Sequence, residues 1–234
     1  MSGRSPAELL PVEEAYRLWA PNYDATPNPL LSLERRFLSP LLGSAAGCDV
    51  VDLGCGTGRW LTQFETVGAR SITGVDISAE MLERASLRAG SSARLIQTDC
   101  LNTSLPAASS DWILASFLLS YVADLQAFAK EASRIARPGA LVLLSDLHPA
   151  TRSYGWKRTF RSAQRVIEVQ SQSYEIAGMR RAMEKAGFEQ VLLHELPFGD
   201  QEREIFLDAN RPDLFDKVKG LPVLFVAGFR RESE

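Results

Sequence analysis

The sequence predicts an α/β fold with a doubly wound, mostly parallel sheet of seven strands. Short apolar runs that suit buried strands alternate with amphipathic stretches of helical period, and this alternation is typical of a sheet covered by helices on both faces. A glycine-rich turn joins the first strand to the helix that follows it. The expected strands are residues 49–53, 71–76, 93–98, 111–116, 140–145, 190–196 and 223–229.

Length and composition narrow the class of protein. A chain of 234 residues favours one domain, and 45% hydrophobic residues suffice for a core. The formal charge of −3 argues against general nucleic-acid binding. Cys48, Cys55 and Cys100 lack the spacing of a disulfide framework or a metal site, which favours a reduced, cytoplasmic protein. Residues 1–14 do not resemble a signal peptide, and no apolar run is long enough to span a membrane.

The remaining elements follow from caps and breakers. A short helix is expected over residues 12–20, ended by Pro21, and a second begins after Asn28 with Pro29 in its first turn. After Pro149 the pattern breaks, and an irregular segment with one or two exposed strands is expected near residues 166–170. Residues 197–220 suggest a polar loop with a short helix near 211–218. The other expected helices are residues 59–67, 78–90, 122–136 and 175–185.

The turn after the first strand predicts a ligand site. Gly54, Gly56 and Gly58 alternate behind Asp52, and glycine lets a ligand approach the backbone N–H groups at a helix start. The dinucleotide fingerprint G-x-G-x-x-G is not matched, because Arg59 stands where the last glycine would be. This disfavours a nicotinamide oxidoreductase. We expect Asp52 to orient the turn rather than to touch the ligand.

Polar residues follow several of the expected strands, at the edge where open α/β sheets bind ligands. Asp76 lies 20 residues beyond Gly56, at the distance where an acid meets a ribose. A carboxylate accepts from both ribose hydroxyls and repels phosphate, so Asp76 favours a nucleoside. Taken singly, such an Asp is more often a helix cap or a turn residue. Asp99, Ser116 and Asp146 occupy the equivalent places on other strands.

The G-x-G-x-G run behind an acid resembles motif I of the class I S-adenosylmethionine-dependent methyltransferases, in particular the small-molecule, methyltransferase-11-like group. Residues 16–24 resemble the lead-in "YDxWAxxYD" of many such enzymes, with Arg17 in place of the first Asp. The resemblance implies a Rossmann-like sheet with an antiparallel last strand. We accordingly expect a single domain with four parts: a helical N-terminal lid (1–44), a cofactor-binding half (45–150), an insertion (151–174) and C-terminal strands (175–234). Quinone-biosynthesis and malonyl-carrier-protein methyltransferases share these motifs.

The resemblance also implies the cofactor, S-adenosyl-L-methionine, and its product, S-adenosyl-L-homocysteine. Asp76 and Ile77 would hold the ribose and flank the adenine, the pair Asp99–Cys100 would bind the adenine, and Ser116 would contact the methionine portion. Trp19 and Tyr23 offer aromatic faces to the sulfonium. The expected cofactor-binding set is Gly54, Cys55, Gly56, Asp76, Ile77, Asp99, Cys100, Ser116, Trp19 and Tyr23.

The methyl acceptor is expected to be a small molecule with an O- or C-nucleophile, with no nucleic-acid or membrane partner and no metal. Transfer needs in-line positioning, to which a general base can add. His148, just past the fifth strand, is the candidate base, although the alternative of a loop histidine bonded to backbone is slightly favoured. Tyr121 is the second candidate catalytic residue and is expected to line the acceptor pocket. The basic stretch 152–165 faces either an acidic acceptor or solvent. A catalytically silent S-adenosylmethionine-binding regulatory or partner protein is the alternative function.

Overall fold

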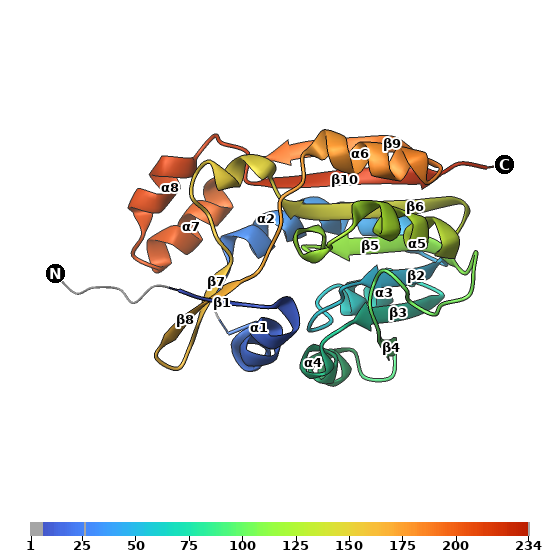
Figure 1. Ribbon diagram of the computed structural model, residues 1–234, viewed down its shortest axis with the longest axis horizontal. Helices are drawn as coiled ribbons and strands as arrows, with labels where there is room; N and C mark the ends of the chain where they lie inside the picture. Colours follow the sequence, from blue (N-terminus) through green and yellow to red (C-terminus); the bar gives the residue numbers. More distant parts are fainter. Residues whose placement is uncertain (1–6, 26, 234) are drawn as a thin grey trace.

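The computed structural model describes residues 7–25 and 27–233 (Figure 1). Expectations for residues 1–6, which begin the N-terminal segment, lie outside the described residues. A seven-stranded sheet runs in the order β4-β3-β2-β5-β6-β10-β9, and β10 is antiparallel to both of its neighbours. The expected fold class is thereby confirmed. The strands are β2 (Asp49–Leu53), β3 (Ser71–Asp76), β4 (Arg94–Gln97), β5 (Ser110–Ser116), β6 (Ala136–Leu147), β9 (Phe188–Leu196) and β10 (Leu224–Arg231).

Helices cover both faces of this sheet, so β2 and β5 are buried on both sides. Val50 and Trp112 belong to a core shared with α2, α3 and α4, whereas Val51 and Ile113 belong to a core shared with α5 and α6. The strand order reverses between the parallel neighbours β2 and β5, and this switch point is where open α/β sheets bind ligands. The helices are α2 (Pro29–Leu38), α3 (Leu61–Thr66), α4 (Ala79–Ala89), α5 (Leu125–Ile135) and α6 (Ile176–Lys185).

The two helices expected in the N-terminal segment are present, and they begin and end close to the predicted residues. Helix α1 (Val12–Trp19) leads into a 3₁₀ turn, η1 (Ala20–Asn22), and α2 continues into η2 (Ser39–Ala45). The Asn28 side chain accepts a hydrogen bond from the Leu30 N–H at 2.9 Å, and Pro29 occupies the first helical position. Within the described chain, no helix has the length and apolar character needed to cross a membrane.

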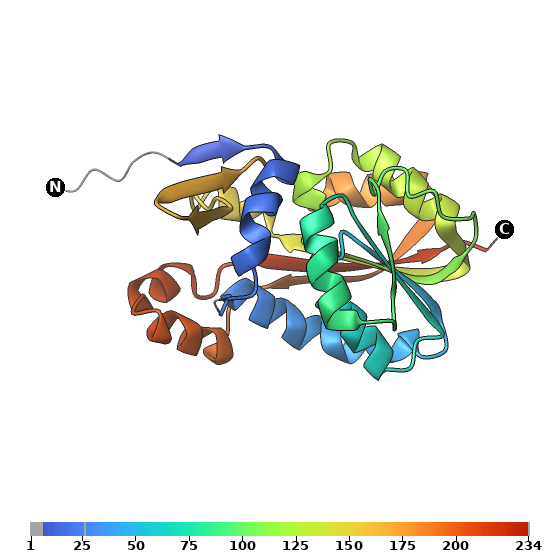
Figure 2. The same cartoon turned by 90° about the horizontal axis from the view of Figure 1, so that it is seen from below.

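A second, three-stranded sheet was not predicted. Strand β1 (Glu8–Leu10) pairs in parallel with β8 (Arg165–Val169), which pairs with β7 (Thr159–Ser162). Figure 2 shows β1 beside this hairpin, with α1 below them. The strands expected in the insertion form, but the expectation that they are exposed was wrong for one face of β8. On that face Ile167 and Val169 are buried against Leu10 and Ala15. The insertion is therefore joined to the N-terminal segment.

The C-terminal half differs from expectation in two places. Residues 197–220 contain α7 (Asp200–Asp208) as well as the expected α8 (Pro212–Val218). Helix α7 depends on the fully buried Glu202, whose carboxylate accepts from the Gly199 N–H at 2.9 Å and pairs with Arg36 at 2.8 Å. Strand β6 begins at Ala136, earlier than predicted, directly after α5 ends.

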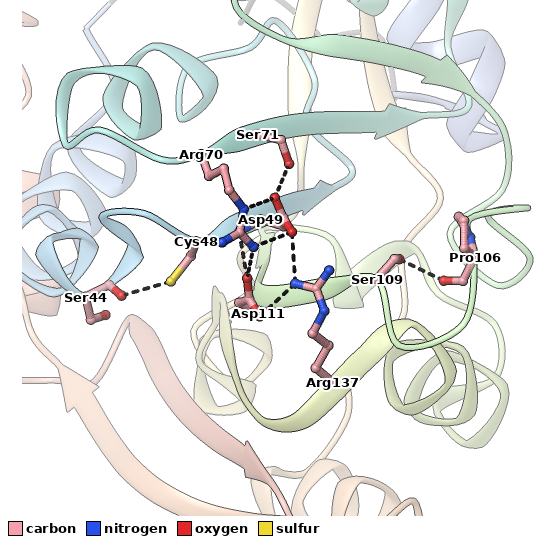
Figure 3. Close-up of polar contacts among 9 residues, drawn as sticks. All are labelled: Ser44, Cys48, Asp49, Arg70, Ser71, Pro106, Ser109, Asp111 and Arg137. Atoms are coloured by element: carbon pink, nitrogen blue, oxygen red, sulfur yellow. Dashed lines mark hydrogen bonds and ion pairs between the residues drawn. The ribbon is translucent and has the colours of Figure 1, made fainter.

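An ion-pair network joins the amino ends of the central strands, opposite the ligand edge (Figure 3). Arg70 donates to Asp49 and to Asp111, each at 2.9 Å. Arg137 contacts the same two carboxylates at 2.9 and 2.7 Å. Two arginines and two aspartates from separate strands and loops thus form one network in which each positive charge contacts both negative charges.

Candidate functional site

A cavity of about 230 Å³ lies at the carboxyl edge of the sheet. The glycine loop, the ends of β3 and β5, the loop after β4, and α1 with its following turn form its walls. Nine predicted site residues line it: Tyr23, Gly54, Gly56, Asp76, Ile77, Asp99, Cys100, Ser116 and Tyr121. Cys55, Trp19 and His148 do not.

The glycine loop brings bare backbone to the cavity. Gly54 has φ +71°, and a Cβ there would lie 2.8 Å from Leu118 Cδ1. Gly56 has φ +53°, and a Cβ there would meet nothing within 4 Å, so its backbone faces open space. Cys55 turns away, since its Sγ would lie 2.9 Å from a Cβ on Gly74.

Two carboxylates are fixed by backbone at the strand ends. Asp76 accepts from the Gly56 N–H at 2.8 Å and from the Ser78 N–H at 2.9 Å. Burial raises the pKa of Asp76, and these hydrogen bonds act against that rise. Asp99 accepts from the Leu101 N–H at 2.9 Å. Burial and the neighbouring Asp99 raise the pKa of the Cys100 thiol to about 12, so the thiol stays protonated near neutral pH.

Asp52 lies behind the loop and is buried. Neither carboxylate oxygen of Asp52 has a hydrogen-bond partner within residues 7–25 and 27–233. Burial raises its pKa well above the usual range. The structure therefore shows no side-chain hydrogen bond by which Asp52 would orient the glycine turn.

Ser116 belongs to a buried polar network that sequence reasoning missed. Its hydroxyl donates to Glu34 Oε1 at 2.7 Å and accepts from Trp60 Nε1 at 3.2 Å. Glu34, fully buried on α2, also forms an ion pair with Arg59 and accepts from the Ser145 hydroxyl. The partners are far apart in sequence. Helical spacing does place Glu34 on the apolar face of α2, four residues from Leu30 and from Leu38, but it does not identify the partners.

Aromatic residues enclose the other end of the cavity. The Tyr16 hydroxyl donates to the Tyr121 hydroxyl at 2.9 Å, and both rings line the cavity with Tyr23. Burial raises the pKa of Tyr121 to about 12, so this phenol is a hydrogen-bond donor rather than a base near neutrality. Trp19 stands outside the cavity and contacts Tyr23 edge-on, with ring centroids 5.0 Å apart.

His148 is held outside the cavity. Its Nδ1 accepts from the Ala150 N–H at 3.2 Å, which places the proton of the neutral ring on Nε2. Nε2 lies 3.0 Å from Glu195 Oε2. Both ring nitrogens are thus engaged in local structure at the start of the turn η4 (Pro149–Arg152).

A seven-stranded sheet with this strand order, one antiparallel strand and a carboxylate-lined cavity at the switch point is the architecture of class I methyltransferases. A family model described as a methyltransferase domain matches residues 51–144. The demethylmenaquinone methyltransferase of Tropheryma whipplei is 34% identical over 156 residues, covering 63% of this chain and 62% of that protein. The ubiquinone biosynthesis O-methyltransferase of Rhodopseudomonas palustris is 32% identical over 115 residues, covering 48% and 45%.

Among solved structures, an S-adenosylmethionine-dependent methyltransferase from Mesorhizobium loti matches with a TM-score of 0.70 at 21% identity, covering 87% of this chain and 100% of that one. Residues 51–144 thus match the methyltransferase-domain family, and the fold of the chain is that of solved S-adenosylmethionine-dependent methyltransferases. It spans about 62% of the length of the first curated relatives that it matches.

Proposed function

We propose that this protein transfers a methyl group from S-adenosyl-L-methionine to a small-molecule acceptor. One observation carries the proposal: the described residues that line the cavity include the acids Glu13, Asp76 and Asp99 but no lysine or arginine. A pyrophosphate would be repelled there, whereas a cationic nucleoside would be attracted. Two relatives named for quinone-biosynthesis methylation support a small-molecule acceptor by similarity.

The residues present fit this cofactor. The open space before Gly56 admits a ligand to the backbone, and the Asp76 carboxylate beside it would accept from ribose hydroxyls. Asp99 and Cys100 would hold the adenine, and Ser116 would meet the methionine end. When bound, the cofactor supplies an electrophilic methyl group on a sulfonium. The protein's part is to orient the acceptor and exclude water.

The acceptor would lie at the tyrosine end of the cavity. Tyr121, protonated near neutrality, would donate a hydrogen bond to an acceptor oxygen. No histidine or lysine stands among the described residues that line this cavity, so its only basic side-chain groups are carboxylates, which are weak bases near pH 7. An acceptor whose oxygen or carbon nucleophile is already acidic therefore fits best. The same observation also favours, as second candidate, a protein that binds the cofactor without transferring it.

Calorimetric titration tests the binding half of the proposal. S-adenosylmethionine and S-adenosylhomocysteine should bind with one-to-one stoichiometry and NAD should not. Asp76→Ala should weaken both affinities about tenfold or more, a change of about 1.4 kcal/mol. Asp208→Ala, an exposed acid on α7, is the matched control. Binding of NAD without binding of the sulfonium would overturn the proposal.

Turnover then separates the two candidate functions. A methyl-transfer assay with labelled S-adenosylmethionine is run against hydroxyl, carboxylate, acidic-carbon and amine acceptors. Transfer to any acceptor supports the enzyme. Tight cofactor binding with no transfer to the whole panel supports the silent binding protein.

A further inference from the structure

Arg158 is a buried guanidinium that the proposed function leaves unused. It precedes β7, and its side chain is 11% exposed. Its Cζ lies 4.8 Å from the ring centre of Phe117 and 5.3 Å from that of Tyr121. Both rings line the cofactor cavity, so a permanent positive charge stands directly beside the acceptor end.

The guanidinium has few partners for its five N–H donors. It contacts Asp146 through one nitrogen, Nη2 to Oδ1 at 3.0 Å. The Asp146 carboxylate is shared, because it also accepts from the Ser120 N–H at 2.7 Å, the Ser120 hydroxyl at 2.8 Å and the Leu147 N–H at 2.7 Å. Arg158 Nε is buried with no partner among the residues described. An under-bonded buried cation of this kind indicates a missing acceptor.

Arg158 lines a second cavity, of about 50 Å³, with Arg152, Lys157 and His148, whose two ring nitrogens are bonded to the Ala150 N–H and to Glu195. Asp146 is the single carboxylate among its described lining residues. Lys157 is paired with Glu168 at 2.8 Å, but Arg152 and Arg158 together still outnumber Asp146. This cavity and the cofactor cavity share one wall, the 3₁₀ turn η3 (Leu119–Tyr121): Ser120 faces the small cavity and Tyr121 the large one. The volume suits one small charged group and not a whole acceptor.

We propose that Arg158 binds a carboxylate of the methyl acceptor in this second cavity, so that the acceptor is an organic acid. The inference rests on the proposed function. A planar guanidinium with free N–H groups matches a carboxylate geometrically, and the pairing is strong when water is excluded. It also resolves a charge conflict. A cationic cofactor and the Arg158 cation would repel one another across the tyrosine wall, because Asp146 is shared with other donors, and an anion bound to Arg158 offsets that repulsion.

Calorimetry on the full chain saturated with S-adenosylhomocysteine tests this. The probes are matched pairs of acids and amides on one skeleton, from acetate and acetamide to 4-hydroxybenzoate and 4-hydroxybenzamide, with inorganic phosphate as a separate arm. At least one acid should bind tenfold or more tightly than its amide. Arg158→Met should bring that ratio close to one and leave the affinity for S-adenosylhomocysteine within twofold. Arg161→Met, an exposed arginine on β7, should preserve the ratio.

Three results would overturn the inference: no acid preference in any pair, a preference that survives in Arg158→Met, or binding of phosphate alone. If Arg158→Met fails to fold, Arg158→Lys is the second variant. It keeps the positive charge but loses the planar pair of N–H donors that a guanidinium offers to a carboxylate. It should therefore weaken binding of the acid about tenfold and leave binding of the amide unchanged. Equal effects on acid and amide would then contradict the inference. Failure of S-adenosylhomocysteine itself to bind the wild-type chain would instead refute the proposed function.

Discussion

The Trp19 ring lies parallel to the Phe160 ring, with centroids 4.6 Å apart and planes 4° from parallel. Trp19 ends α1, whereas Phe160 belongs to β7 in the insertion. The same two parts of the chain are joined by parallel pairing of β1 with β8 and by an ion pair of Glu8 with Arg165 at 3.1 Å. The N-terminal segment and the insertion thus pack against each other beside the cavity at the carboxyl edge of the sheet.

This stacking predicts that the two parts open together. Phe160→Ala removes the stacking partner and a largely buried ring, so it should speed amide exchange over residues 8–20 about tenfold or more while β2 and β5 keep their protection. Hydrogen exchange followed by mass spectrometry measures both regions. Leu87→Ala, at an exposed site, is the control and should change neither. Unchanged exchange in α1 would show that the stacking does not hold it.

Glu34 predicts a large effect on stability. Glu34→Gln keeps the shape of the side chain but removes the counter-ion of Arg59. Breaking a fully buried pair from one side costs about 3–5 kcal/mol, and because the Arg59 side chain is 24% exposed we expect a loss of about 3 kcal/mol, at the lower end of that range. Urea unfolding should show this loss, whereas Glu83→Gln at an exposed site on α4 should change the free energy of unfolding by less than about 0.5 kcal/mol. A loss below about 1 kcal/mol for Glu34→Gln would contradict the expectation that Arg59 depends on Glu34 as its counter-ion.

The network at the amino ends of the strands predicts a dependence of stability on pH. Hydrogen bonds from Arg70, Ser71 and Arg137 hold the pKa of Asp49 well below its usual range. A depressed pKa in the folded state stabilises the protein above the unfolded value of about 3.9, and that stability is lost as pH falls below it. Because Arg70 is 57% exposed, we expect only about 1 kcal/mol at moderate salt.

Asp49→Asn tests that expectation. The variant should be less stable than the wild type at pH 7, and the difference should shrink as pH falls below about 4 and also at 1 M salt, where surface charges are screened. Unfolding in urea at both pH values and both salt concentrations gives the comparison. A difference that stays constant between pH 7 and pH 3 would assign the effect to packing instead.

The sheet was predictable because its information is local. Each buried strand is a short apolar run with a turn at its end, and the caps Asn28 and Ser78 lie where their helices begin. What was missed depends on distant partners. Strand β1 pairs with a strand about 157 residues away, and α7 is stabilised by a contact from Glu202 to Arg36, 166 residues away. No periodicity within either segment records those contacts.

The candidate site divides in the same way. Gly56, Asp76 and Asp99 follow strands at one edge of the sheet, so strand direction alone brings them together. Glu34 and Arg158 reach the site from segments whose position the strand pattern does not determine. Their burial is a tertiary property, which is why sequence reasoning placed Arg158 only in a basic stretch with two alternative environments.

His148 gives the last prediction, because the sequence suggests a base there and the structure engages both ring nitrogens elsewhere. A base must reach the proton that it removes. His148→Ala should therefore lower turnover less than tenfold and leave cofactor affinity unchanged, while the loss of bonds to the Ala150 N–H and Glu195 lowers the free energy of unfolding by about 1–2 kcal/mol. Tyr121→Phe, which removes a hydroxyl that faces the cavity, is the comparison and should lower turnover more. A loss of about 100-fold in His148→Ala, with a pH profile that loses one ionisation near neutrality, would restore His148 as the base and require the loop that carries it to move toward the cavity.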